Sequence, residues 1–407
     1  MNATWLIEQL EHLSQFGRSE TGVTRLAFSA EDELAREFIL NQMQEIGLKI
    51  RMDGFGNIFG RLEGTQPALP AIATGSHMDS VPDGGKYDGP VGVIAALSAL
   101  RELKARGPLT TSVEMIVFSA EESSRFGYAT MGSKVIAGTA DLKSWQKVTD
   151  SKGITLPEAL ASSGFDFTRL LEARRSPGEW KAFIELHIEQ GPVLDQEEIQ
   201  IGIVTGIAGP TRLRLSITGV ANHSGTTPMD CRHDACVSAA HIILAVRQAA
   251  CKEMKLGTVG TVGSVRVTPG VMNVVPGSAE LLIDIRGVDY SSIERVVAEV
   301  RRAVDRIVLE EGTSIEITVL SAEQPVLLDP NIASMIECSC KQLGLTYRHM
   351  HSGAGHDAMN MAKLTPTGMI FIPCRDGISH NNAEYAAPKD IEAGAAVLLE
   401  ALYFLAK

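Results

Sequence analysis

Four short stretches carry the side chains that could do chemistry, and each stands at or near the end of an apolar run. The first contains His77 and Asp79, followed by Asp88 on a glycine-rich loop. A histidine binds a metal ion through one ring nitrogen, and a neighbouring carboxylate can orient it. His77 and Asp79 are two residues apart, so on a strand they point to the same side. The alternative is a polar turn with one hydrogen-bonded histidine.

Glu121 and Glu122 form the second stretch, directly after the apolar run 113–120. Two adjacent carboxylates repel each other unless a cation or a proton separates them. One of them could bind a metal ion while the other acts as a general base on a water at that ion. The alternative is an acidic helix start, which the helix dipole favours.

Two more histidines complete the set. His187 stands inside an apolar alternation at 183–188, and His380 follows the strand-like segment 368–373. Each stretch has a structural explanation when taken alone. Three histidines and several carboxylates at the ends of apolar runs nevertheless point together to a metal site. Nitrogen and oxygen ligands of this kind suit zinc, manganese, cobalt or nickel and do not choose among them.

The composition is that of an ordinary globular protein with room for two domains, since the chain has 407 residues and is 44% hydrophobic. No apolar run approaches the roughly 20 residues that span a bilayer. The N-terminus is amphipathic and acidic without a signal-peptide layout, so we expect a cytoplasmic protein without a membrane partner. The net charge of −12 argues against nucleic acid. The six cysteines form no Cys-x-x-Cys pair, and we expect free, buried thiols.

The elements that must position these residues alternate between strands and helices. Strand-like runs precede His77, Glu121 and His380, and helical patterns follow Asp88 and close the chain at 388–406. This alternation predicts an α/β domain with a mainly parallel sheet covered by helices. In open sheets of that kind, ligands bind at the carboxyl ends of the strands.

The order of the predicted strands and helices changes after the segment 206–210, Gly-Ile-Ala-Gly-Pro, which is typical of a hinge. From there the expected elements follow the order βαββαβ, a ferredoxin-like unit. We therefore predict a catalytic domain of residues 1–208 and 322–407 with a domain inserted at 209–321. Polar residues near element ends of the insertion could reach a site in the other domain, although ordinary loop polarity is the simpler explanation. These residues are 222–228, Asn273 and Arg286.

Motifs spread over nearly the whole chain resemble those of the amidase, hydantoinase/carbamoylase family. They are Gly-Ser-His-Met-Asp-Ser-Val-Pro at 75–82, Gly-Gly-Lys-Tyr-Asp-Gly-Pro at 84–90, Glu-Glu-Ser-Ser-Arg-Phe at 121–126, Glu-Leu-His-Ile-Glu-Gln-Gly at 185–191, His-Ser-Gly-Thr-Thr-Pro-Met at 223–229, Ser-Gly-Ala-Gly-His-Asp-Ala at 352–358 and Gly-Ile-Ser-His-Asn at 377–381. The family contains N-carbamoyl-L-amino acid hydrolases, allantoate amidohydrolases and ureidoglycolate hydrolases. It is related to dinuclear-metal aminoacylases and exopeptidases.

The resemblance implies two divalent metal ions per subunit (manganese, cobalt, nickel or zinc), with Asp88 bridging them. The implied metal ligands are His77, Asp88, Glu122, His187 and His380. The implied catalytic residues are Glu121 as general base, Asp79 as the residue that orients His77, and His223 as donor to the developing oxyanion. The implied substrate-binding residues are Gln190, His223, Asn273, Arg286, Gly353 and His356. The resemblance also implies a homodimer in which the inserted domain is a lid and brings His223 and Asn273 to the partner subunit's site.

The implied reaction is cleavage of the ureido C–N bond of a small carboxylate-bearing substrate. The segments Met131-Gly132-Ser133 and Ile136-Ala137-Gly138-Thr139 resemble the L-carbamoylases, so we expect N-carbamoyl-L-amino acids to yield L-amino acid, carbon dioxide and ammonia. Ser123 stands where both groups usually have glycine. The alternatives are an allantoate amidohydrolase, an N-acyl amino acid or dipeptide hydrolase, and a non-catalytic ureide or amino-acid binding protein. The intact Glu121 argues against the last, because binding alone needs no general base.

Overall fold

The computed structural model describes residues 3–407, which form two compact units. Unit 1 comprises Met1–Thr205 and Leu328–Lys407, and unit 2 comprises Gly206–Leu327. Each unit has a hydrophobic core of its own. None of the helices in residues 3–407 combines the length and apolar character that crossing a membrane requires.

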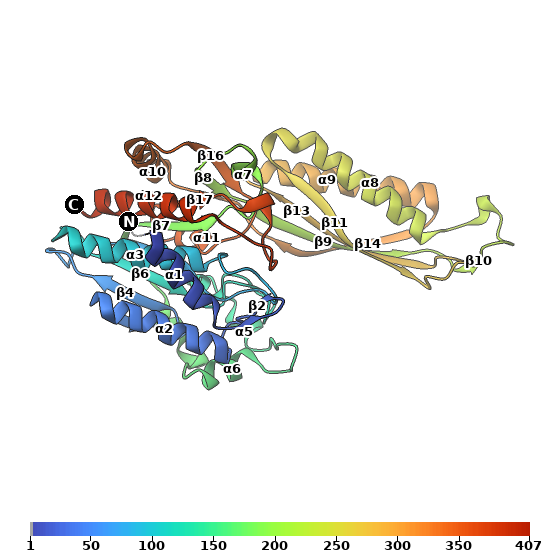
Figure 1. Cartoon of the computed structure of the whole chain (residues 1–407). Helices are drawn as coiled ribbons and strands as arrows, with labels where there is room; N and C mark the ends of the chain where they lie inside the picture. The colour runs from blue at the N-terminus through green and yellow to red at the C-terminus, as the bar shows by residue number, and fades with distance from the viewer. Residues whose placement is uncertain (1–2) are drawn as a thin grey trace. The chain divides into compact units, whose positions relative to one another are not determined.

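Unit 1 is built on a large mixed sheet with strand order β15-β8-β17-β7-β5-β6-β4-β3, in which β16 also pairs with β8 (Figure 1). Within this sheet, β15 and the last two residues of β8 fall inside the bounds of unit 2. The strands are β3 (Lys49–Met52), β4 (Ile58–Leu62), β5 (Ala71–His77), β6 (Val113–Phe118), β7 (Trp180–Ile188), β8 (Ile201–Ile207), β15 (Val326–Leu327), β16 (Tyr347–Ser352) and β17 (Thr367–Ile372). The central strands β17, β7, β5 and β6 pair in parallel. Their outer neighbours β8 and β4 are antiparallel. The expected mainly parallel α/β sheet is therefore confirmed.

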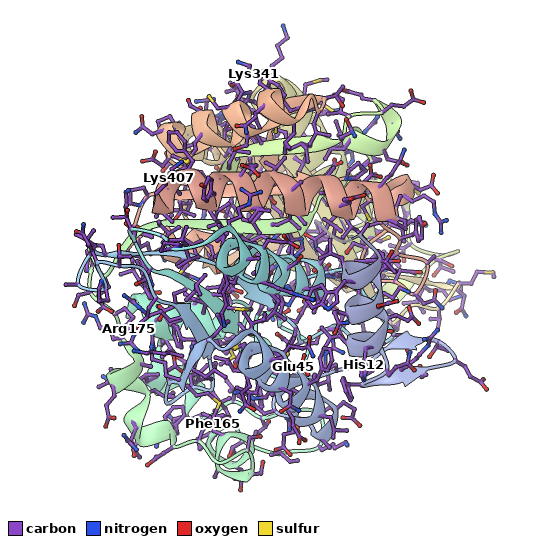
Figure 2. The ribbon with its side chains drawn as sticks, turned by 60° about the vertical axis from the view of Figure 1, so that its left-hand side comes forward. His12, Glu45, Phe165, Arg175, Lys341 and Lys407 are labelled. Atoms are coloured by element: carbon purple, nitrogen blue, oxygen red, sulfur yellow. The ribbon has the colours of Figure 1, made fainter. Side chains whose placement is uncertain are left out.

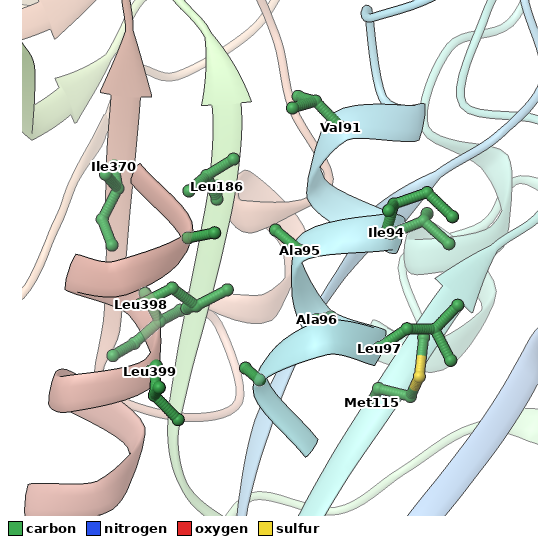
Figure 3. Close-up of a cluster of buried hydrophobic side chains, with 14 of the residues drawn as sticks. Val91, Ile94, Ala95, Ala96, Leu97, Met115, Leu186, Ile370, Leu398 and Leu399 are labelled. Atoms are coloured by element: carbon green, nitrogen blue, oxygen red, sulfur yellow. The ribbon is translucent and has the colours of Figure 1, made fainter. Parts of the chain in front are cut away.

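Helices α3 (Pro90–Arg106) and α12 (Pro388–Ala406) contact each other and the central strands (Figure 1). Figure 3 shows this core, in which Ala95 of α3 and Leu398 of α12 lie beside Leu186 of β7. Leu186 and Ile184 point into it, because alternate residues of a strand face opposite sides of a sheet. Glu185 and His187 therefore belong to the other face. The remaining helices of unit 1 are α1 (Ala3–Ser14), α2 (Ala30–Ile46), α4 (Met131–Ala137), α5 (Leu142–Trp145), α6 (Leu156–Ser162), α7 (Val193–Gln196), α10 (Pro330–Leu343) and α11 (Ala358–Met361).

The N-terminal helices show how local sequence sets the ends of an element. The Ser29 side chain caps α2 by accepting a backbone hydrogen bond, and the helix ends at Gly47 in the left-handed conformation. Helices α1 and α2, which carry the labelled His12 and Glu45, lie side by side in Figure 2. The ring of His12 meets that of Phe38 at a centroid distance of 4.6 Å.

Unit 2 has the expected βαββαβ order. Its elements are β9 (Gly209–Thr218), α8 (Ala235–Glu253), β11 (Val259–Thr268), β13 (Ser278–Gly287), α9 (Tyr290–Glu311) and β14 (Ser314–Ala322). The four strands form an antiparallel sheet in the order β11-β13-β9-β14. Leu213, Leu215 and Ile217 of β9 are buried in the core with α8 and α9, while the alternate residues are exposed. A short ribbon of β10 (Asn222–His223) and β12 (Val274–Val275) was not expected.

The segment 206–210 is extended, because Gly206 and Ile207 pair with β15 and β9 begins at Gly209. Unit 2 begins within this segment, at Gly206, and a hinge there stays a prediction. One detail of the sequence interpretation is wrong, namely the expected burial of all cysteines. Cys340 and Cys374 are buried, but four free thiols are exposed, namely Cys231, Cys236, Cys251 and Cys338. Cys236, for example, stands one residue beyond the buried Ala235 on the solvent side of α8.

Candidate metal centre

The four parallel strands end at one edge of the unit 1 sheet, where the predicted ligands and base gather. His77 is the last residue of β5, and His187 is the next-to-last residue of β7. Glu121 follows β6, and His380 lies on the loop after β17. Parallel strands bring such residues together because their carboxyl ends share an edge.

Asp88 lies at the centre of this group, on the loop before α3. Its Oδ1 is 3.7 Å from His77 Nε2 and 3.2 Å from His187 Nε2. Its Oδ2 is 3.3 Å from His380 Nε2. Gly89, with a φ of +82°, turns the chain here, and a Cβ at this position would overlap the His77 ring.

Two sets of side chains could each hold a metal ion, and they share Asp88. One is His77, Asp88 and His187, and the other is Asp88, Glu122 and His380. In the second set, His380 Nε2 is also 3.2 Å from Glu122 Oε1. Glu121 belongs to neither set but is buried beside the first, with Oε2 at 3.8 Å from His77 Nε2.

The hydrogen bonds of the buried histidines fit a metal ion. His187 Nδ1 is 2.9 Å from the carbonyl oxygen of Ile188, and His77 Nδ1 is 3.0 Å from that of Asp79. Because a carbonyl only accepts, each Nδ1 carries a hydrogen, which leaves Nε2, the ring nitrogen that faces Asp88, as the one that could bind a metal ion. His187 Nε2 is buried without a hydrogen-bond partner among the described residues. A cation between this nitrogen and the carboxylate would satisfy both.

The pKa shifts of these side chains also fit a metal site. Burial alone would raise the pKa of Asp88, but the neighbouring histidines hold it well below its usual value. Burial would lower the pKa of His77, yet the carboxylates around it, Glu121 first, raise it well above normal. Asp88 and Glu122 raise the pKa of His380 to about 10. Protons and divalent cations would compete for these side chains, so metal binding should release protons.

The carboxylate of Asp79 lies beside His77, as expected, and also contacts the turn that follows β6. Its Oδ1 lies 3.7 Å from His77 Nδ1, which bonds to the backbone carbonyl of Asp79 instead. The two carboxylate oxygens accept the backbone N–H groups of Glu121 and Glu122 at 3.1 and 3.0 Å. Asp79 thus fixes the turn that carries both glutamates. That turn is not an acidic helix start, since the next described helix, α4, begins at Met131.

The surroundings of Glu121 shift its pKa in the direction that a general base requires. Burial, followed by the negative charge of Glu122, raises the pKa of Glu121 well above its usual value, although His77 opposes the shift. A carboxylate whose pKa is raised toward neutrality can both accept and return a proton.

The other expected site residues of unit 1 differ in exposure. Gln190 donates from Nε2 to Asp88 Oδ2 at 2.6 Å, and its Oε1 is buried without a hydrogen-bond partner among the described residues. Gly353 is exposed on the loop after β16. His356 is buried and packs edge-on against His187 at a centroid distance of 4.6 Å. Burial lowers the pKa of His356 well below normal, so it supports the His187 ring as a neutral group.

The three expected site residues of the insertion lie in unit 2. His223 is exposed on β10, and Asn273 is on the exposed turn before β12. Arg286 lies on β13, where Nε and Nη2 donate to the two oxygens of Asp284 at 2.7 and 3.0 Å. Their part in a substrate site stays a prediction.

Sequence reasoning missed two residues beside the second ligand set. Ser379 Oγ donates to Asp88 Oδ2 at 2.7 Å. Glu384 is buried and accepts backbone hydrogen bonds from Tyr87 and Asp88. Burial and then the charge of Asp88 raise the pKa of Glu384 to about 7. Glu384 lies in an irregular segment outside any apolar period, so the sequence holds no signal for it.

Known proteins resemble this chain over nearly its whole length. The model of peptidase family M20/M25/M40 matches residues 73–403. A rice protein named ureidoglycolate hydrolase is 40% identical, covering 98% of this chain and 83% of its own length. An N-carbamoyl-L-amino acid amidohydrolase of Geobacillus stearothermophilus is 38% identical over 99% of this chain and 98% of its own. An allantoate amidohydrolase of Escherichia coli is 37% identical over 98% and 97%.

A solved structure agrees with these relatives. A hydantoinase/carbamoylase family amidase from Burkholderia multivorans superposes with a TM-score of 0.93 at 34% identity, covering 100% of this chain and 98% of that one. The resemblance stated from the motifs is thereby confirmed. These relatives are named for three different substrates, and their sequence identities to this chain are close together. Similarity therefore supports a ureido-cleaving amidohydrolase without selecting one substrate.

Proposed function

We propose that this chain, which belongs to peptidase family M20/M25/M40, is a two-metal amidohydrolase that cleaves the ureido C–N bond of N-carbamoyl-L-amino acids. The products would be the L-amino acid, carbon dioxide and ammonia. The observation that carries the proposal is Asp88, whose two oxygens face two different groups of metal ligands. A shared carboxylate of this kind is typical of a dinuclear centre.

The chain's own residues can move the protons that the reaction requires. Two divalent ions in these sets would lower the pKa of an attacking water and polarise the ureido carbonyl. Glu121, buried 3.8 Å from His77, would accept the water proton and return it to the leaving nitrogen. The backbone N–H bonds to Asp79 hold Glu121 in place while its side chain changes charge.

The substrate contacts that we propose follow from the chemistry of the residues. Gln190 stands beside Asp88 and can orient the ureido group. We assign donation to the developing oxyanion to His223, a polar contact to Asn273, and the α-carboxylate to Arg286. Arg286 already pairs with Asp284, so a bound carboxylate would share or replace that partner. We also infer that His223 and Asn273 act in the partner subunit of a homodimer.

The second candidate substrate is allantoate, another ureido compound with a carboxylate. Relatives named for carbamoyl amino acids and for allantoate match this chain to similar extents. We favour the carbamoyl compound because residues 131–139 resemble the L-carbamoylases.

Ammonia release from a small substrate panel tests the proposal. The protein is stripped of metal and reloaded separately with manganese, cobalt, nickel or zinc. The panel contains N-carbamoyl-L-methionine, its D-enantiomer and allantoate, with N-acetyl-L-methionine and a dipeptide as controls assayed for acetate or amino-acid release. We expect metal-dependent turnover of the L-carbamoyl compound. Turnover of allantoate alone would agree with the proposed two-metal centre but would replace the proposed substrate by allantoate. Hydrolysis of only the acetyl compound or the dipeptide would refute the ureido reaction.

A non-catalytic binding protein would behave differently in the same assay. Wild type and Glu121→Gln would then be equally inactive on every ureide while still binding one of them. A large difference in turnover between these two proteins rules that class out.

A further inference from the structure

Glu384 connects the two loops that carry Asp88 and His380. One of its oxygens accepts the backbone N–H groups of Tyr87 and Asp88 at 2.9 and 3.1 Å. The other lies 3.1 Å from the hydroxyl of Ser379, the residue before His380. The same hydroxyl lies 2.7 Å from Asp88 Oδ2, so its single hydrogen is shared between the two carboxylates.

Glu384 occupies an unusual position for a carboxylate. It is 5% exposed, and none of the ion pairs of residues 3–407 includes it. Burying a carboxylate without a cationic partner is costly, so its hydrogen bonds are its main compensation. Those bonds all go to residues that carry or adjoin predicted ligands of the second set.

The second ligand set depends on such support more than the first. His77 and His187 lie on strands, and each ring is fixed by a local carbonyl oxygen. His380 lies on a loop in the left-handed conformation with a φ of +56°, and its side chain is 49% exposed. The hydrogen bonds of a regular strand therefore do not fix the direction of the His380 ring.

We propose that Glu384 is a positioning residue that holds the loops of Asp88 and His380 together and thereby sets the affinity for the ion bound by Asp88, Glu122 and His380. The inference rests on the proposed two-metal centre. Residues that orient metal ligands typically change metal affinity about 10- to 100-fold when they are removed.

Gly85 provides an independent way to disturb the same contact. A Cβ at Gly85 would overlap the Glu384 carboxylate, and Gly85 does not have a positive φ. Gly85→Ala should therefore displace Glu384 without straining its own backbone, and it should reproduce the loss of the Glu384 contacts.

The test compares Glu384→Gln, Glu384→Met and Gly85→Ala by equilibrium dialysis of the metal-stripped protein against manganese or cobalt, with elemental analysis of the bound ions. Glutamine can still accept the two N–H bonds and can donate to Ser379, whereas methionine keeps the volume and loses every bond. We take the ion of the second set to be the weaker of the two, because His380 lies on a loop and its side chain is 49% exposed. We expect this ion to bind about 10- to 100-fold less tightly in Glu384→Met and Gly85→Ala. In Glu384→Gln both ions should bind within a few-fold of wild type, and the tighter ion should be unchanged throughout.

Glu114→Gln is the matched control. Glu114 is another buried carboxylate, and it accepts from Trp180 Nε1 at 2.9 Å at the opposite end of β6 from Glu121. The Glu114→Gln variant should be less stable than wild type and should still bind both ions. Wild-type binding of both ions by Glu384→Met would overturn the inference, and so would equal losses in Glu384→Gln and Glu384→Met. If Glu384→Met does not fold, Gly85→Ala and Glu384→Gln decide the question. If wild type itself binds fewer than two ions, the proposed function fails as well, which the same titration shows separately.

Discussion

Replacing Asp79 by asparagine separates two roles that a carboxylate beside a metal ligand can have. One role is to orient His77, as the sequence suggested, and the other is to fix the Glu121–Glu122 turn. The carboxylate accepts both N–H groups of the turn, at 3.1 and 3.0 Å, whereas His77 bonds to the backbone carbonyl. The variant should therefore disturb the base and leave His77 in place.

The size of the effect follows from the hydrogen bonds. Asparagine has one acceptor oxygen, so one buried N–H group of the turn must face an N–H₂ donor. A hydrogen bond to a charged group contributes about 1.5–3 kcal/mol, which corresponds to about a 10- to 150-fold decrease in kcat if the loss is felt at Glu121.

The assay measures kcat and KM for ammonia release together with the affinity of the tighter ion. We expect kcat to fall within that range while the tighter ion binds as in wild type. Asp329→Asn controls for the substitution itself, because Asp329, at the start of α10, accepts two backbone N–H groups through Oδ1 alone and asparagine keeps that oxygen. A tenfold loss of affinity for the tighter ion with an unchanged kcat would refute this reasoning and return Asp79 to the role of orienting His77.

Three further predictions concern the base, the substrate carboxylate and the stability. Glu121→Gln should lower kcat by at least about 100-fold while both ions remain bound, as kinetics and elemental analysis will show; near-normal turnover would exclude Glu121 as the base. Arg286→Lys should raise KM about tenfold or more and change kcat less, because lysine cannot form the two-pronged contact to a carboxylate; an unchanged KM would remove Arg286 from the substrate site. Burial raises the pKa of Asp32 from 3.8 to about 6, so the folded chain binds this proton more tightly than the unfolded chain. Wild type should therefore gain stability relative to Asp32→Asn, by up to about 3 kcal/mol, as the pH falls through 6 toward 4, and lose it as the pH rises; parallel Tm curves of the two proteins would contradict the shift.

The sequence predicts most of the fold because the decisive signals are local. Ser29 and Gly47 mark the two ends of α2, and the alternation of Leu213, Leu215 and Ile217 marks a strand with one buried face. Part of the candidate metal centre could also be predicted, since the expected ligands His77 and His187 and the expected base Glu121 each stand at or near the end of a strand-like run. To predict that these strand ends lie close together, one must first predict that the strands are parallel neighbours. The alternation of strands with helices supports that prediction.

The remaining features depend on contacts between distant segments. Glu384 reaches Asp88 across almost 300 positions of the chain, at a separation of 296 residues, and no periodicity records such a bond. The contact of Asp79 with the Glu121–Glu122 turn has the same origin, because its partners are the N–H groups 42 and 43 residues away. The ribbon of β10 and β12 consists of two-residue strands, which are too short to show an alternation. The exposed Cys236 shows that residue type predicts burial less well than helix phase does.

The most direct test of the central claim is a titration of the metal-stripped protein in which bound ions and ammonia release are measured on the same samples. N-carbamoyl-L-methionine and allantoate are offered in parallel, so the result does not depend on the choice of substrate. The two ligand sets that share Asp88 predict that turnover appears only with a divalent ion and reaches its maximum when two ions are bound per chain. Full turnover in the presence of a chelator, or a maximum reached with one ion, would contradict the two-metal account.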